Sequence, residues 1–207
     1  MSVKRRVRHT KNSIDEYLEN FLPFDVIDKF IEQSPWNVKV LNEQVAWYTH
    51  SGFRHVRAHD DSRTVAFNKA ISDHGKTMNG LILLQGYTRG EQDLLRMNIP
   101  VKQTAAISCT CDTQIARIFG SSRKERKSGT CTFTIAIHRF MDTKGIYVHS
   151  GMGKVLFPEF EFILPKGLWV TLRRREVRRC GSETYVILHC DVSTNGGPRD
   201  LCANEGQ

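Results

Sequence analysis

The stretch LFPEFEFILPKG, residues 156–167, has the apolar run of a buried strand but carries Glu159 and Glu161 within it. Side chains two residues apart in an extended strand point to the same side, so both carboxylates share one face, about 6–7 Å apart at the backbone. The phenylalanines and leucine offer the other face to a core. Like charges this close repel unless a cation, an amide or a ligand lies between them. Taken alone, the pair is better explained by an edge strand with a wet outer face, because exposed glutamate is common, so a functional meaning depends on neighbouring motifs.

A second motif is AAISCTCDTQIARIFG, residues 105–120, where an apolar run ends at Ser108-Cys109-Thr110. Asp112 then has the position of a helix N-cap before the apolar residues of TQIARIF. The hydroxyls of Ser108 and Thr110 therefore lie where a strand ends beside a helix start. Such hydroxyls either fix a neighbouring carboxylate or ribose by hydrogen bonds, or satisfy local backbone groups.

A third motif is LILLQGYTRGEQ, residues 81–92, a short apolar strand followed by Arg89 and Gly90. An arginine at a strand end clamps a phosphate or carboxylate with two hydrogen bonds, and an adjacent glycine lets the backbone approach closely. The alternative is an ordinary surface arginine.

In this order the three motifs resemble the Arg–Ser–Glu class of mono-ADP-ribosyltransferases, which includes binary-toxin components and phage-encoded enzymes. In that family an aromatic-Arg-Gly strand precedes a Ser-Thr-Ser strand with a downstream Ala and Phe, and then Glu-x-Glu. Here YTRG, SCT with ARIF, and EFEFILPKG take those places, and the resemblance covers about residues 47–192. Thr88 interrupts the usual Tyr-Arg adjacency, so either Arg89 or the Gln85 position corresponds to the family's arginine.

The resemblance implies an enzyme that cleaves NAD and transfers ADP-ribose to a target, with NAD as substrate and no metal. Glu161 takes the place of the catalytic glutamate, which stabilises the ribosyl cation. Ser108 would hold that carboxylate. Glu159 takes the place of the glutamate that prepares an arginine acceptor, which implies a target protein with an acceptor arginine. The implied NAD contacts are Arg89, Gly90, Thr110 and Phe119.

The pattern of apolar residues predicts an α+β fold with an N-terminal helical lobe followed by a two-sheet β core. Helices are expected from Ser13 to about Pro23, from Ser34 to before Gly52 and over roughly 62–72. From Gly80 onward short apolar runs and period-two alternation predict strands. The organisation expected from this pattern is a basic flexible arm at 1–12, a single catalytic domain over 13–192 (helical to about 79, β-rich from about 80) and a loose tail over 193–207.

The net charge of +8 is concentrated at residues 4–11, 117–127 and 166–179. Basic charge of this kind suits an anionic ligand or partner, or simply a solvated face. A different function therefore stays open. One alternative is a non-catalytic nucleic-acid-binding protein that uses RRREVRR at 173–179, a run expected at the end of one strand and the turn into the next. Another is a transferase whose basic surface finds a nucleic acid or a nucleic-acid-bound target.

The six cysteines have irregular spacings without a CxxC pair, which favours free thiols over disulfides or a metal site. No run of about 18 apolar residues is present, and no apolar core follows the basic start, so neither a membrane span nor a secretory signal is predicted. The protein is expected in the cytoplasm where it is made. The resemblance adds delivery into, or action in, a host cell.

Overall fold

The computed structural model describes residues 13–35, 37–52, 61–87, 95–121, 131–148 and 160–195, with only the backbone described at Ser51 and Gly52. The expected basic arm and residues 196–207 of the expected tail lie outside the described residues. Three of the candidate site residues, Arg89, Gly90 and Glu159, also lie outside them.

Five α-helices and one π-helical turn are described. They are α2 (Ser13–Glu19), α3 (Phe24–Gln33), α4 (Lys39–Trp47), the π-helical η1 (Tyr48–Gly52), α6 (Ser62–His74) and α7 (Thr113–Phe119). The expected helices at the N-terminus and over 62–72 are confirmed. The side chain of Asp61 caps α6 by accepting hydrogen bonds from the backbone N–H groups of Arg63 and Thr64.

The helix expected to start at Ser34 starts later, at Lys39. Ser34 instead ends α3, a helix that the sequence analysis did not identify, and its backbone N–H bonds to the carbonyl of Ile31. The Ser34 hydroxyl accepts a hydrogen bond of 2.8 Å from the backbone N–H of Tyr147, so it serves a strand and not a helix start. Ser-Pro is a helix-start signal only where the serine has no better partner.

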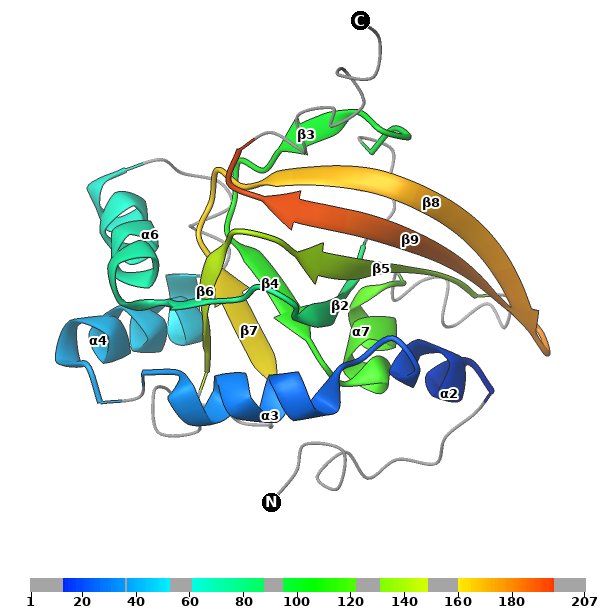
Figure 1. Cartoon of the computed structure of the whole chain (residues 1–207), viewed down its shortest axis with the longest axis horizontal. Helices are drawn as coiled ribbons and strands as arrows, with labels where there is room; N and C mark the ends of the chain where they lie inside the picture. Colours follow the sequence, from blue (N-terminus) through cyan, green and yellow to red (C-terminus); the bar gives the residue numbers. More distant parts are fainter. Residues whose placement is uncertain are drawn as a thin grey trace, which may run out of the picture.

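The strands pair in one order, β1-β6-β7-β4-β2-β5-β9-β8-β3 (Figure 1). They are β1 (Lys76–Thr77), β2 (Ile82–Gly86), β3 (Pro100–Lys102), β4 (Ile107–Thr110), β5 (Thr132–Phe140), β6 (Lys144–Tyr147), β7 (Glu161–Leu164), β8 (Trp169–Cys180) and β9 (Glu183–Ser193). All described pairs of neighbouring strands are antiparallel except β5 and β9, which run parallel. The expected α+β class, with helices before strands, is confirmed.

The sheet has two halves that meet between β2 and β4. In the described residues a single residue pair, Leu84 with Thr110, joins these two strands. By contrast, β4 pairs with β7 through four residue pairs and β2 with β5 through five. The expected two-sheet core therefore takes the form of two sheet halves that share one narrow junction, and the described parts of the three candidate motifs lie on β2, β4 and β7 around it.

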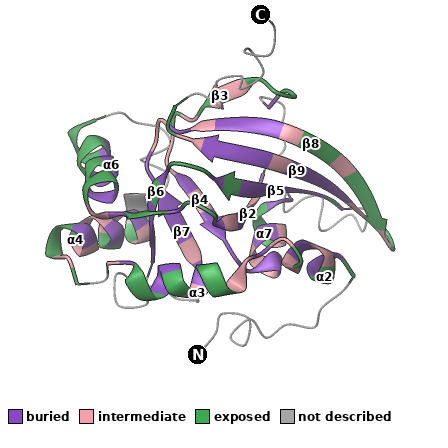
Figure 2. Ribbon diagram, viewed as in Figure 1, coloured by how far each residue is buried: buried purple, intermediate pink, exposed green. Residues whose placement is uncertain are grey.

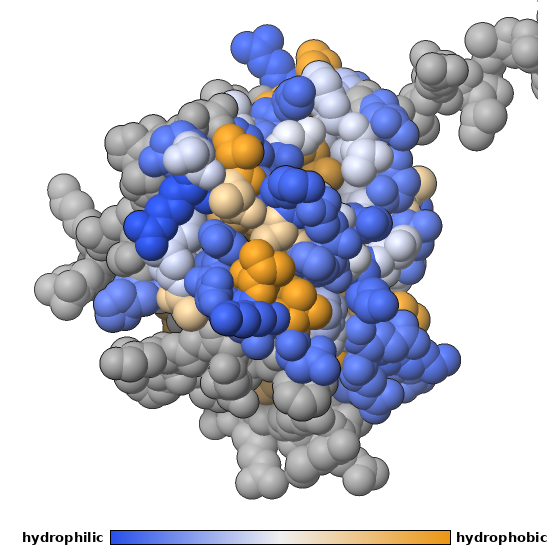
Figure 3. Space-filling model, turned by 90° about the vertical axis from the view of Figure 1, so that its left-hand side faces the viewer, coloured by the Kyte–Doolittle hydropathy of each residue, from blue (hydrophilic) through white to orange (hydrophobic). Residues whose placement is uncertain are grey.

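Helices cover both halves of the sheet, and their buried sides turn toward it (Figure 2). Phe30 of α3 packs on Phe162 of β7 with ring centroids 5.9 Å apart, which joins α3 to the larger of two hydrophobic clusters. The smaller cluster lies under α4 and α6, where Tyr48 stacks on Phe67 at 4.9 Å between centroids. The face that carries α4 and α6 shows separate apolar spots among polar side chains (Figure 3).

The arginine-rich segment at 173–179 was expected at a strand end and its turn, and this placement was wrong. The segment lies inside β8, which continues to Cys180, and the turn comes at Gly181 with φ of 60°. The sequence shows no alternation of apolar and polar residues here, because both faces of this part of β8 carry charged residues. Near its start, Asp191 of β9 bonds Arg139 and Arg173 at 2.8 Å each, so one carboxylate joins three neighbouring strands.

Candidate active site

Ser108 and Glu161 meet where β4 lies beside β7. The antiparallel register pairs Thr110 with Glu161 and Ser108 with Ile163, so Ser108 and Glu161 are diagonal neighbours. The Ser108 hydroxyl donates a hydrogen bond of 2.7 Å to Oε1 of Glu161. Both side chains are half-buried. A charge-assisted bond of this length fixes the rotamer of the carboxylate.

Strand β7 begins at Glu161 because the residue before it is not extended. Phe160 has φ of 47°, in the left-handed region that residues other than glycine seldom adopt. The expectation that residues 159 and 161 share a face assumed an extended backbone at Phe160, and this assumption was wrong. Glu159 itself lies outside the described residues. Left-handed residues of this type are concentrated at functional sites, where the surrounding structure holds the strain.

Thr110 and Asp112 shape the turn from β4 into α7. The Thr110 hydroxyl accepts a hydrogen bond of 3.0 Å from the backbone N–H of Asp112. The Asp112 carboxylate accepts from the N–H groups of Gln114 at 2.8 Å and Ile115 at 3.1 Å, so the expected N-cap is confirmed. Thr110 is buried and pairs with Glu161 in the register of β4 and β7. Its hydroxyl takes part in the local turn.

Cys109, between the two hydroxyl residues, faces the larger hydrophobic cluster and is 2% exposed. Burial, and after it the nearby charge of Glu161, raises the pKa of this thiol well above its ordinary value. The thiol is therefore protonated at neutral pH and chemically quiet. The five described cysteines are all free, in agreement with the expectation from their spacing, and Cys202 lies outside the described residues.

Helix α7 rests against the end of β2, and a glycine makes this contact feasible. A Cβ atom on Gly86 would lie 2.3 Å from both the carbonyl oxygen of Ala116 and the backbone nitrogen of Gly120. Ala116 is fully buried at this contact, whereas Phe119 at the end of the helix is 52% exposed. The aromatic side chain of Phe119 is thus half exposed at the end of the helix.

The end of β2 carries Gln85, the alternative to Arg89 in the motif comparison. Gln85 Oε1 lies 2.9 Å from Nε2 of His138 on the neighbouring β5. Burial lowers the pKa of His138 to about 4, so the ring is neutral at pH 7. Because an amide oxygen only accepts, Nε2 carries the proton and donates it to Gln85. Gln85 is therefore already engaged by a core histidine.

Sequence comparison with protein-family models and with curated proteins finds no match. Comparison with solved structures finds similar folds. The Vis toxin, an ADP-ribosyltransferase from Vibrio splendidus, aligns with TM-score 0.53 and 14% identity over 96% of this chain and 92% of its own. The chain has an ADP-ribosyltransferase fold.

Two further structures share the ADP-ribosyltransferase fold of this chain. The C3 exoenzyme of Clostridium limosum aligns with TM-score 0.59 and 12% identity over 90% of this chain and 97% of its own. Exoenzyme S of Pseudomonas aeruginosa, solved with human 14-3-3 protein beta and carba-NAD, aligns with TM-score 0.54 and 16% identity over 91% and 96% of the two chains.

The described helices include none that is both long and apolar enough to cross a membrane. In the described ranges, no three His, Cys, Asp or Glu side chains are gathered in a way that would hold a metal ion.

Proposed function

We propose that the protein is a mono-ADP-ribosyltransferase that uses NAD as its substrate, with Glu161 as the catalytic carboxylate and Ser108 as the residue that positions it. The observation that carries the proposal is the 2.7 Å hydrogen bond between these two side chains, placed where β4 and β7 meet beside the junction of the two sheet halves. The ADP-ribosyltransferase fold of the chain supports the same chemistry.

Glu161 acts in this proposal by stabilising positive charge. When the bond between the ribose C1′ and nicotinamide nitrogen breaks, the electron pair leaves with nicotinamide and the ribose becomes cation-like. A carboxylate aimed at that cation is most useful in the transition state, and it does not need to move because Ser108 already holds it. Nicotinamide leaves as a neutral molecule, so no strong general acid is required.

The acceptor proposed is an arginine side chain of a target protein. Attack of a guanidinium nitrogen on C1′ forms a new C–N bond and releases one proton, which Glu159 would accept as general base. The structure of Vis with agmatine, a guanidinium compound, shows that one protein of this fold binds such a group. That observation concerns Vis, and it motivates the acceptor proposed for this chain.

The remaining NAD contacts follow from the motifs. Arg89 would clamp a phosphate or ribose with Gly90 allowing close approach, and Thr110 and Phe119 would contact the nucleotide from β4 and α7. We further propose that residues 13–192 act as a single catalytic domain, since helices α2 and α3 pack on the same cluster as the strands of the site.

The alternative of a nucleic-acid-binding protein receives less support. Of the arginines in β8, Arg173 pairs with Asp191 at 2.8 Å, and Arg174 and Arg178 lie 3.6 and 3.8 Å from Glu176. Arginines that neutralise carboxylates of their own protein contribute less to phosphate binding.

The test is the release of nicotinamide from NAD, with and without agmatine, by the full chain and by Glu161→Gln, Glu159→Gln and Ser108→Ala. Glu161→Gln should lower turnover about a thousandfold, as expected when a main electrostatic contribution is removed. Glu159→Gln should spare NAD hydrolysis but abolish transfer to agmatine.

The matched control is Glu43→Gln, the same isosteric change at an exposed glutamate on α4. It should leave turnover unchanged. The proposal fails if the folded native protein neither binds NAD by calorimetry nor releases nicotinamide.

A further inference from the structure

The β8–β9 hairpin leaves the edge of β8 open along most of its length, although β5 pairs with β9 as far as Thr184. β3 pairs with β8 only over residues 169–171, and a single bridge joins Met97 to Leu172. From Arg173 to Cys180 the described residues supply no strand on that side, while β9 pairs along the other side. Figure 1 shows β8 as the outer strand of this part of the hairpin, which bends down toward α2. An open edge presents unpaired backbone N–H and C=O groups.

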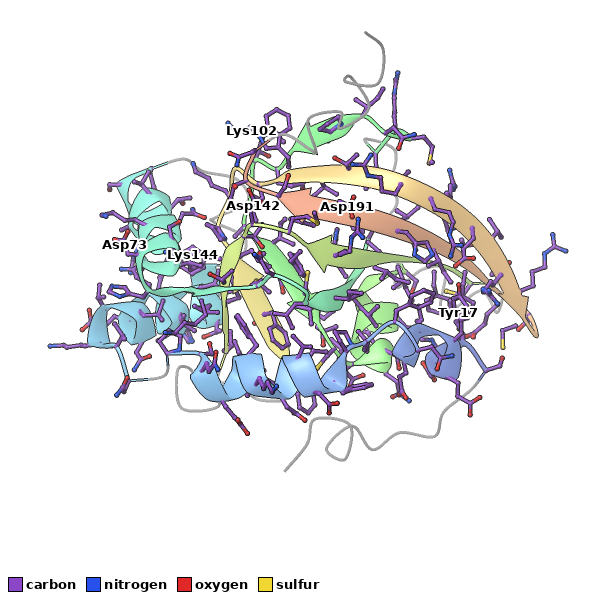
Figure 4. The ribbon with its side chains drawn as sticks, viewed as in Figure 1. Tyr17, Asp73, Lys102, Asp142, Lys144 and Asp191 are labelled. Atoms are coloured by element: carbon purple, nitrogen blue, oxygen red, sulfur yellow. The ribbon has the colours of Figure 1, made fainter. Side chains whose placement is uncertain are left out.

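One face of this edge strand is saturated by partners within the protein. Glu176 accepts hydrogen bonds from Tyr17 of α2 and from His189 of β9, the latter at 3.0 Å. Arg174 lies 3.6 Å from the same carboxylate, and the guanidinium of Arg178 lies 3.5 Å from the ring centre of Tyr17. Tyr17 reaches the hairpin from the helix below it (Figure 4). This face therefore ties the hairpin to α2.

The opposite face carries Arg175, Val177 and Arg179, which alternate with the saturated residues. All three are exposed, and Val177 is 59% exposed, the largest value among the exposed large apolar side chains described. Within the described part of the chain, the two arginines make no side-chain hydrogen bond or ion pair, in contrast to Arg173, Arg174 and Arg178. The strand thus presents positive, apolar and positive side chains, with the arginine Cα atoms about 13 Å apart.

We propose that this edge is a docking site for an extended segment of a partner protein with the pattern acidic–x–apolar–x–acidic, added as a further strand beside β8. Backbone hydrogen bonds to the open edge would hold the segment. Its acidic residues would lie across from Arg175 and Arg179 and its apolar residue across from Val177, as cross-strand pairs of opposite charge and of apolar type.

Other occupants fit this edge less well. A second copy pairing edge to edge with Val177 opposite Val177 would place arginine opposite arginine in either strand direction, which is destabilising. A nucleic acid would use the two arginines but neither the exposed valine at the centre nor the open backbone. Arg173, Arg174 and Arg178 already pair with Asp191 or Glu176. The acidic extended segment uses all three features.

The probe is a fluorescein-labelled seven-residue peptide, Thr-Glu-Thr-Val-Thr-Glu-Thr, compared with the same peptide carrying Gln in place of both Glu. Binding to the full chain is followed by fluorescence anisotropy, and backbone amide shifts of ¹⁵N-labelled protein locate the site. The acidic peptide should bind at least about tenfold more tightly than its amide counterpart, and binding should weaken with salt. The largest amide shifts should fall on residues 174–180.

The matched variants reverse two charges each. Arg175→Glu/Arg179→Glu should weaken binding of the acidic peptide at least about tenfold. Lys29→Glu/Lys39→Glu, at exposed lysines of α3 and α4, should change the affinity for the peptide less than about twofold. Circular dichroism establishes that both variants are folded. Nicotinamide release should be the same in both variants, because the docking site does not depend on the proposed catalytic role.

Four results would overturn the proposal. If neither peptide binds, the arginines only protect an edge strand from aggregation. Equal weakening in both double variants means that overall charge, and not this edge, attracts the peptide. Tighter binding of an oligonucleotide that Arg175→Glu/Arg179→Glu abolishes assigns the surface to nucleic acid. A dimer seen by sedimentation that the same variant dissolves assigns it to a second copy.

Discussion

Replacing Ser108 by alanine tests how the candidate site works, because it removes one hydrogen bond and leaves the carboxylate in place. The bond that is lost measures 2.7 Å and its acceptor is charged. Bonds to charged groups contribute about 1.5–3 kcal/mol, and the half-buried setting favours the lower end. About 1.5 kcal/mol corresponds to a roughly tenfold loss of rate.

The loss should fall on kcat and spare KM for NAD. Ser108 positions a carboxylate that matters most in the transition state, so ground-state binding should change little. Steady-state nicotinamide release over a range of NAD concentrations separates the two constants. Ser108→Thr, which keeps a hydroxyl, should recover most of the lost rate, and Ser72→Ala on the exposed surface of α6 should match the native protein.

Two results would refute this reasoning. If Ser108→Ala keeps kcat within about twofold, the hydrogen bond does not position Glu161 in any way that matters for the reaction. If it loses as much activity as Glu161→Gln, or raises KM with kcat intact, the hydroxyl contacts the substrate directly. The free energy of unfolding should fall by about 1.5 kcal/mol, the contribution of the lost hydrogen bond, which urea unfolding measures.

Three further predictions concern stability and reactivity. Gly86→Ala should destabilise the fold by about 3 kcal/mol, because the new Cβ would lie 2.3 Å from backbone atoms of Ala116 and Gly120. An unchanged urea midpoint would show that α7 shifts to make room for the methyl group without loss of stability. The pKa of His138 falls from 6.5 unfolded to about 4 folded, so the unfolded state takes up the proton first and stability is lost as pH drops through this range. The loss should reach about 2 kcal/mol by pH 5, and His138→Gln, whose amide nitrogen also donates to Gln85, should lose correspondingly less; equal losses would mean that other groups cause it. Cys109 should resist iodoacetamide in the folded protein and react in urea, as followed by peptide mass spectrometry, whereas modification at the rate of half-buried Cys180 would contradict its placement.

Local signals in the sequence were reliable where the interacting groups are close in the chain. The N-cap at Asp112 bonds backbone groups only two and three residues away, so its geometry follows from a few dihedral angles. The helix expected from Ser34 failed for the opposite reason. The Ser34 hydroxyl accepts a hydrogen bond from the backbone N–H of Tyr147, which lies 113 residues along the chain, and no local sequence pattern reveals such a partner.

The order of motifs indicated which residues belong together in the site, but not how they touch. Ser108 and Glu161 are 53 residues apart, and their contact depends on a register between β4 and β7 that alternation alone leaves undetermined. Gln85 and His138 are likewise 53 residues apart and meet only because β2 lies beside β5. The left-handed Phe160 has no sequence signal, since residues of its type rarely adopt that conformation.

The parallel pairing of β5 with β9 has a consequence for how the chain folds while it is being synthesised. β9 is the last described strand in the sequence, yet it lies between β5 and β8, with nine residue pairs to β5. While the chain emerges from the ribosome, the strands that carry Ser108 and Glu161 are complete before the strand that fills this central position exists. Early folding intermediates should therefore expose the edge of β5 that β9 later covers. Chaperone contact at that stage is expected to end once β9 has been made and the β8–β9 hairpin pairs with β5.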